Sequence, residues 1–324
     1  MSMPATTERG EHAAWHQVLF YEDRRQYVDG VLRFVDTALD GGRPVFVAVP
    51  PANGELLRRH LDGRGEQVRL ADMTRLGRNP SLIIPQIRGF IDEHPGRPVS
   101  FVGEPAWATR TPAEIAEVTR HEALINAAFD GSGAQVLCPY DIAGLAAPAV
   151  ADAMRTHPEL VDPAGRRQPS ERYTDPRTVW ADTGHLPSPP AGAEQITVAR
   201  SDLGRLRSLA RQIAAPLLAA AALDELLLAV TELATNSVRH GGGTATATIW
   251  ATSDRVVCDV ADNGSITDAL AGRRRPDPDA STGRGLWLVN HLCDLVQLHS
   301  SRHGTRVRIT VAPPLPAAPF SAGT

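Results

Sequence analysis

Three polar side chains at helical spacing are the first residues in this chain whose types could carry out chemistry. Glu232, Asn236 and His240 are four residues apart within the segment ELATNSVRH, so in a helix they lie on one face. The amide oxygen of Asn236 suits Mg²⁺, which prefers oxygen donors, and a carboxylate one turn away can orient or deprotonate an attacking hydroxyl group. Taken alone, such a pattern is more often an ordinary solvated helix face.

Three glycine-containing segments follow along the chain. The first, residues 262–264 (DNG), comes directly after an apolar strand, where its carboxylate can accept a hydrogen bond from the amino group of adenine, a donor that guanine lacks there. In the second, Gly283 and Gly285 precede an apolar helix, and small residues there let backbone N–H groups approach phosphate oxygens. The third, Gly304 and Thr305, lies in an expected hairpin. Each segment by itself is also explained as a turn or loop.

The elements expected around these residues form an α+β domain with helices on one face of a mixed sheet. Periodicity and flanking turn residues predict the helices, the strands and a Pro/Arg-rich loop. Helices are expected at 202–213, 223–240 and 284–294, strands at 244–251, 255–262, 295–301 and 305–311, and the loop at 265–282.

Before residue 160, helical and extended patterns alternate, which predicts an α/β domain with a mainly parallel sheet. Asn53 and Thr111 are expected to cap two of its helices. Strands are expected at 44–50, 67–72, 98–104 and 134–141. The carboxyl edge of such a sheet is where α/β folds bind ligands. The residues expected there, which could equally be structural loop residues, are Asp72, Glu104, Trp107, Tyr140 and Asp141.

Composition shifts divide the chain into two domains and a linker. The first domain is expected at 15–160 and the second at 194–312. A proline-rich linker is expected at 161–193, partly extended with one short ordered stretch near Val179. The two ends, 1–14 and 313–324, are expected to be disordered.

Composition also excludes several mechanisms. All 33 basic residues of the 324-residue chain are arginine, which rules out a P-loop lysine, a Schiff-base lysine and a protein-kinase β3 lysine. The net charge of −4 argues against direct binding to nucleic acid. Cys138, Cys258 and Cys293 form no C-x-x-C pair, so we expect buried free thiols rather than a zinc or redox site. No signal core or membrane span is expected, and we predict a cytoplasmic protein.

The order of the chemical segments resembles the ATP-binding fold shared by gyrase, Hsp90, histidine kinases and MutL. Within that superfamily the chain is most similar to the anti-sigma-factor serine/threonine kinases of actinobacteria. ELATNSVRHGG resembles their N box, DNG their G1 box and TGRGLWLV their G2 box. The resemblance covers residues 194–311 and implies a Bergerat-type ATP-binding sandwich with ATP and Mg²⁺ as cofactors.

Matching positions imply a role for each residue. Asn236 is the implied Mg²⁺ ligand, Glu232 the general base and Asp262 the adenine-binding residue. The remaining positions implied to bind the nucleotide are Gly264, Gly283, Arg284, Gly285, Leu286 and Thr305.

One residue departs from the family pattern. Ile266 stands where the G1 box often has a second glycine, which leaves the path of the lid over the nucleotide open. Because the chain has no lysine, phosphate charge must be met by Mg²⁺, backbone N–H groups and arginine, with Arg284 as the nearest candidate.

The first domain is similar to the MEDS sensory domain over residues 15–160. The similarity rests on the segments HQVLFYEDRRQYVDGVLRFVDTALDGGRPVFVAVP, GEPAW, HEALINAAF and VLCPYD, with THPEL after them. It implies a RecA-like α/β fold that senses a small hydrocarbon-like molecule. Because no Walker sequence is present, we expect no nucleotide at this domain.

Together the resemblances imply a serine kinase of the anti-sigma type under the control of a sensory domain. The expected partner is a STAS-type anti-sigma antagonist, with a sigma factor as a second candidate, and the sequence leaves homodimer formation open. A histidine kinase is the first alternative, with His121 of HEALIN as acceptor, although a strand and a proline-rich linker follow where a dimerising helical hairpin should stand. A non-catalytic module that uses ATP only to hold a conformation is the second, and the missing G1 glycine favours it.

Overall fold

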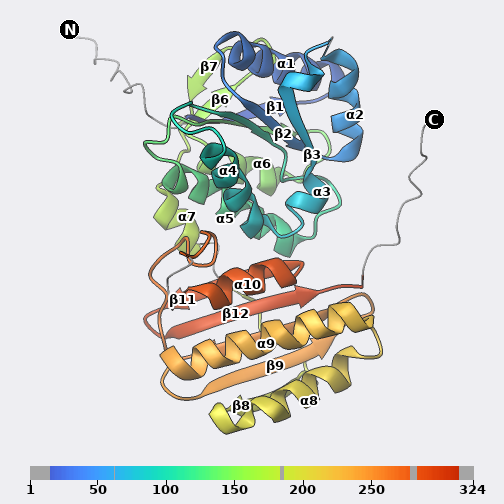
Figure 1. Ribbon diagram of the computed structural model, residues 1–324, viewed down its shortest axis with the longest axis vertical. Coiled ribbons are helices and arrows are strands. Elements are labelled where there is room, and N and C mark those ends of the chain that lie inside the picture. The colour runs from blue at the N-terminus through green and yellow to red at the C-terminus, as the bar shows by residue number, and fades with distance from the viewer. Residues whose placement is uncertain (1–14, 62, 183–185, 278–282, 314–324) are drawn as a thin grey trace. The chain divides into compact units, whose positions relative to one another are not determined.

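A computed structural model describes residues 15–61, 63–182, 186–277 and 283–313. The chain divides into two compact units, Met1–Thr183 and Gly184–Thr324 (Figure 1). Of the two ends that were expected to be disordered, only Pro313 belongs to the described residues. Ser281 and Thr282, which precede Gly283 of the G2-like segment, also lie outside the described residues.

The first unit is built on a seven-stranded sheet with the strand order β3-β2-β4-β5-β1-β6-β7. Neighbouring strands are parallel except for the pair of β6 and β7, which confirms the mainly parallel sheet. The strands are β1 (Trp15–Tyr21), β2 (Val45–Val49), β3 (Val68–Asp72), β4 (Ser100–Gly103), β5 (Gln135–Asp141), β6 (Glu159–Val161) and β7 (Arg167–Pro169).

Helices cover both faces of this sheet. Every residue of β2 is buried, as expected for a strand between two layers. Val45 and Val47 join a core with the first two helices, whereas Phe46 packs on Phe90 of the fourth. The helices are α1 (Arg24–Asp40), α2 (Pro51–His60), α3 (Met73–Leu76), α4 (Ile83–Asp92), α5 (Pro112–Ala128), α6 (Ala147–Thr156) and α7 (Pro176–Asp182).

One of the two predicted helix caps is confirmed and the other is wrong. Thr111 caps α5 in a reciprocal capping box with Glu114, which satisfies two free N–H groups at once. Asn53 lies inside α2, because the helix begins two residues earlier at Pro51, whose fixed φ suits the first helical position. The Asn53 amide instead donates to the carboxylate of Glu104.

The segment expected to be a linker contains regular structure. Within 161–193 lie the end of β6, the short strand β7 and α7. β6 pairs with β1 in parallel, and α7 packs against α5 with Val179 buried. The order arises from these tertiary contacts, which the proline-rich composition did not indicate.

The second unit is a five-stranded sheet with the order β11-β12-β10-β9-β8. All its pairs are antiparallel, so the expected mixed sheet is wrong. The reason is the connectivity: β9–β10 and β11–β12 are hairpins, and β12 returns antiparallel to β10. The strands are β8 (Glu194–Val198), β9 (Ala245–Ala251), β10 (Val256–Asp262), β11 (Leu295–Ser301) and β12 (Gly304–Val311).

Three helices lie side by side over one face of this sheet (Figure 1). They are α8 (Leu203–Ala214), α9 (Ala220–His240) and α10 (Arg284–Leu292). The apolar face of α9, which includes Leu226, Val230 and Leu233, is buried in a core with inward residues of the strands. The remaining face of α9 is free to present polar groups, and the α+β sandwich that the sequence implied is confirmed.

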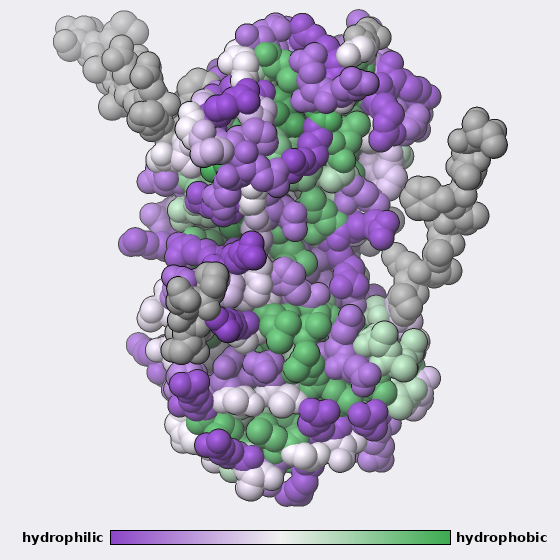
Figure 2. All heavy atoms as spheres, viewed as in Figure 1, coloured by the Kyte–Doolittle hydropathy of each residue, from purple (hydrophilic) through white to green (hydrophobic). Residues whose placement is uncertain are grey.

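Polar side chains cover most of the surface drawn in Figure 2, with apolar ones between them. Among the described residues, no helix is both long enough and apolar enough to cross a membrane.

Candidate functional site

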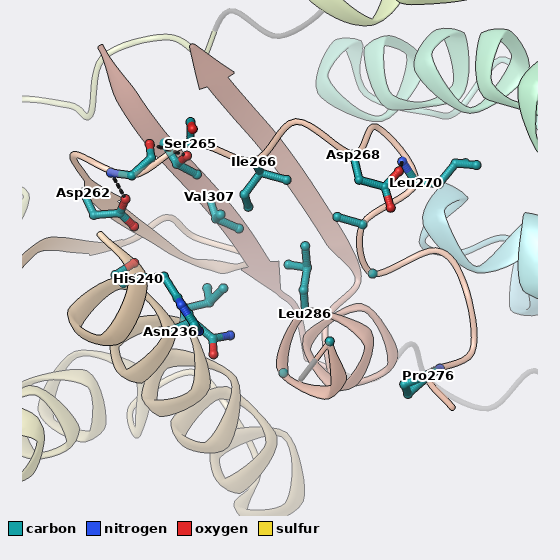
Figure 3. A pocket seen from close by; sticks show the side chains of 18 of the residues that line it. Asn236, His240, Asp262, Ser265, Ile266, Asp268, Leu270, Pro276, Leu286 and Val307 are labelled. Carbon is teal, nitrogen blue, oxygen red and sulfur yellow. Dashed lines mark hydrogen bonds between the residues drawn. The ribbon is translucent and has the colours of Figure 1, made fainter. Parts of the chain in front are cut away.

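A cavity of about 550 Å³ opens in the second unit, within the size range of small-molecule sites. Four parts of the chain surround it: the C-terminal half of α9, the end of β10 with the loop after it, the start of α10, and β12 (Figure 3). The predicted site residues that line it are Asn236, Asp262, Gly264, Gly283, Gly285, Leu286 and Thr305.

Asp262 is held at one end of the cavity by a tight turn. It is the last residue of β10 and pairs with Thr305 of β12. The Gly264 N–H donates to Asp262 Oδ1 at 2.7 Å, and the Thr305 hydroxyl donates to the Gly264 carbonyl at 2.9 Å. A Cβ at Gly304 would collide with the Asp262 carbonyl, so the hairpin needs glycine there. One carboxylate oxygen of the half-buried Asp262 thus fixes the turn, and the other is left for a ligand.

Glu232 and Asn236 meet α10 at Gly285. A Cβ at Gly285 would collide with Asn236 Nδ2 and would lie 3.2 Å from Glu232 Oε2. Neither polar side chain hydrogen-bonds to another residue that the structure describes. Asn236 lines the cavity, while Glu232 lies one turn earlier on α9, outside its lining. The structure therefore brings the predicted base and the predicted metal ligand together beside the glycine segment.

The glycine segment forms the N-terminus of α10. Gly283 is the N-cap residue, with a left-handed φ of 87° that favours glycine. Gly283, Gly285 and Leu286 line the cavity, but Arg284 is exposed and lies outside its lining.

Three residues at the cavity were not expected from the sequence: Arg274 and Arg275 in the loop after β10, and Ser237 on α9. His240, which shares a helix face with Asn236, lines the cavity as well. The run of three arginines at 273–275 was the available signal for cations near phosphate.

Ile266 is held both through its backbone and through its side chain. Its backbone N–H donates to Ser300 Oγ on β11 at 2.7 Å, and its side chain packs against the core of the unit. The loop that begins here is anchored to the sheet before it passes over the cavity to Arg274.

In the first unit, each residue expected at the carboxyl edge contacts a structural partner elsewhere in that unit. Glu104 is buried and accepts hydrogen bonds from the hydroxyl groups of Tyr21 and Tyr27. Burial raises the pKa of Glu104 to about 7, although its three donors oppose that rise. Asp141 fixes a turn through the N–H groups of residues 143 and 144. Of the other three, Asp72 caps α3, Tyr140 donates to Glu122, and Trp107 stacks with Arg110.

The residues around the cavity of the second unit fit a magnesium nucleotide. A carboxylate on β10 and an amide on α9, both half-buried, line the cavity, and oxygen atoms of these groups suit a base amino group and Mg²⁺ respectively. Because residue 285 is glycine, the space beside Asn236, which a Cβ would fill, stays open. An antiparallel sheet with helices on one face and such a cavity defines the nucleotide-binding sandwich that the sequence implied.

A protein-family model matches each of the two units. Residues 15–158 match the family model described as MEthanogen/methylotroph, DcmR Sensory domain (MEDS). Residues 196–311 match the family of histidine kinase-like ATPase domains. The chain thus combines a MEDS sensory domain with a histidine kinase-like ATPase domain, which confirms the two resemblances.

Comparison with individual proteins adds little. No curated protein matches the chain. A crystal structure of the RsbU and RsbW domains of a Mycobacterium tuberculosis protein is similar at 16% identity, with a TM-score of 0.28 over 37% of this chain. The match covers 33% of that chain's length, and so slight a likeness does not bear on the function.

Proposed function

We propose that this protein is an ATP-dependent serine kinase of the anti-sigma type, which phosphorylates a STAS-domain antagonist under the control of its MEDS domain. The observation that carries the proposal is the meeting of Glu232, Asn236 and Gly285. A base, a metal ligand and a glycine loop are the groups that phosphoryl transfer to a hydroxyl requires. The order of the sequence boxes, and not the fold alone, supports the serine specificity and the partner.

Each residue has a distinct task in this proposal. ATP, when bound, supplies the phosphoryl group. The free oxygen of Asp262 accepts a hydrogen bond from the adenine amino group, and the Asn236 amide oxygen is a ligand for Mg²⁺. The Glu232 carboxylate takes the proton from the serine hydroxyl of the partner. Arg274 and Arg275, rather than Arg284, offset phosphate charge from the loop over the cavity.

The histidine kinase alternative is disfavoured by the position of its acceptor. His121 lies within α5 and is 1% exposed, so a γ-phosphate could not reach its ring. The non-catalytic module remains the competing function, because Ile266 packs its side chain against the core at a position where the family often has glycine.

Phosphate transfer distinguishes the kinase from the module. Full-length protein is incubated with radiolabelled ATP and STAS-domain proteins co-purified from the native host. We expect label on a partner serine. Glu232→Gln should retain near-normal ATP affinity, because Glu232 lies outside the cavity lining, while the transfer rate falls by about 10²–10⁴-fold.

Glu225→Gln is the matched control, since Glu225 is an exposed carboxylate on the same helix, and it should transfer at the wild-type rate. Wild-type transfer by Glu232→Gln would refute the role as base. ATP binding with no transfer to any co-purified partner would favour the non-catalytic module.

A further inference from the structure

Four potential metal ligands, none of which takes part in the proposed kinase reaction, converge inside the first unit. They are His16 on β1, Glu122 on α5, Cys138 on β5 and His157 at the C-terminal end of α6. One ligand atom from each lies within 4.8 Å of all the others, and all four residues are at most 2% exposed. No zinc site was expected from the sequence, because it contains no C-x-x-C pair and these ligands are spread from residue 16 to residue 157.

The separations suit one small ion. Glu122 Oε2 lies 3.1 Å from His16 Nε2 and 3.5 Å from His157 Nε2. Cys138 Sγ lies 3.4 Å from both His16 Nε2 and Glu122 Oε2. Ligands at the usual distances from Zn²⁺ in a tetrahedron are about 3.3–3.7 Å apart. These four separations lie within about 0.2 Å of that range, and the remaining pairs of ligand atoms lie within 4.8 Å of each other.

The far side of each imidazole is held by a hydrogen bond, so both Nε2 atoms face the Glu122 carboxylate. His157 Nδ1 lies 2.8 Å from the carbonyl oxygen of Ala153, which can only accept, so this nitrogen carries a proton. His16 Nδ1 lies 3.3 Å from Asn126 Oδ1, and the amide of Asn126 donates to the Thr156 carbonyl. His16 Nε2 hydrogen-bonds to Glu122 Oε2, whereas His157 Nε2 has no hydrogen-bond partner among the described residues.

The carboxylate is oriented in the same way. The Tyr140 hydroxyl donates to Glu122 Oε1 at 3.2 Å, which directs Oε2 toward the imidazoles. Partners that fix the ligands from behind are typical of metal sites.

We propose that His16, Glu122, Cys138 and His157 bind a divalent transition-metal ion, with Zn²⁺ as the ion that the donor set fits best. A thiolate and two imidazoles exclude Mg²⁺ and Ca²⁺, which select oxygen donors. Four protein ligands fill a tetrahedron and leave no open position, which is typical of a structural site. The ion joins two strands and two helices, and Cys138 would bind it as a thiolate.

Metal analysis and cobalt spectroscopy test this site on the full-length protein. Protein purified without chelators should contain one Zn²⁺ per chain, and exchange into Co²⁺ should give a thiolate-to-cobalt absorption band. Cys138→Ser should remove that band. The matched control is Cys258→Ala, a buried free thiol of the second unit, which should retain both the metal and the band.

Tyr140→Phe keeps the ring and removes only the hydroxyl group that donates to Glu122. This variant therefore tests the site even if Cys138→Ser does not fold. We expect its affinity for Zn²⁺ to fall by about 10–100-fold. Folded wild-type protein that carries less than about a tenth of an equivalent of any transition metal, and shows no cobalt band, would overturn the proposal. Unchanged affinity in both Tyr140→Phe and Cys138→Ser would overturn it as well.

Discussion

Asp262 shows how a single side chain can both build a turn and select a base. Its Oδ1 accepts from the Gly264 N–H, and Gly241 and Gly304 pack too closely around it for any Cβ. The residue type at the strand end was predictable from the sequence. The crowding that orients it was not, because Gly241 and Gly304 approach from elements about twenty and forty residues away.

Asp262→Asn should weaken ATP binding and reduce the preference over GTP. The asparagine oxygen must face the Gly264 N–H, so its NH₂ group would point at the adenine amino group, donor against donor. We expect at least a tenfold loss of affinity, about 1.4 kcal/mol, measured by calorimetry with ATP and GTP.

The matched control for this change is Asp254→Asn. Asp254 is an exposed carboxylate of the same unit that lies outside the cavity lining. The variant should bind ATP with nearly wild-type affinity and selectivity. If Asp262→Asn stays as selective as the control, Asp262 is a turn residue only.

At the scale of elements, the site depends on how closely α9 and α10 approach. The pattern of apolar residues predicted both helices, and it predicted that Glu232 and Asn236 share a face. A lone G-x-G segment could not show what its glycines would meet, since that depends on the packing of the two helices. The sequence indicated an ordered stretch near Val179 but not that it forms the helix α7, and it gave no sign of β7, because the order of both comes from contacts with distant segments.

Gly285→Ala should lower ATP affinity by at least tenfold. Its Cβ would collide with Asn236 Nδ2, and either the amide or the start of α10 must move away from the cavity. Gly204→Ala on α8 is the control, because a Cβ there meets nothing within 4 Å. That change should leave binding unaltered and stabilise the helix by up to about 1 kcal/mol. Equal ATP affinities for the two variants would show that the close approach does not shape the site.

At the scale of the whole molecule, the chain buries ionisable groups mainly in its first unit. Glu122 with its two histidines lies on one side of the sheet, and Glu104 with its two tyrosines lies at the carboxyl ends of the strands. Sequence analysis placed Glu104 at that edge but could not predict its burial, because Tyr21 and Tyr27 come from β1 and α1, far away in the chain. Such groups make the stability of the protein depend on pH.

Glu104 should make the first unit less stable as the pH rises from about 4.5 to 7. Its pKa is about 7 in the folded chain and near its ordinary value when unfolded, so the folded state binds more protons in that window. The contribution of Glu104 to the free energy of unfolding therefore falls with rising pH, by up to about 3 kcal/mol, and levels off above pH 7. Glu104→Gln stays neutral and should remove this decline, while Glu55→Gln, which alters an exposed carboxylate, should keep it.

Hydrogen exchange of the β4 amides, corrected for intrinsic rates, measures the local free energy of unfolding at each pH. Parallel profiles for wild type and Glu104→Gln would show that Glu104 titrates as an ordinary carboxyl group.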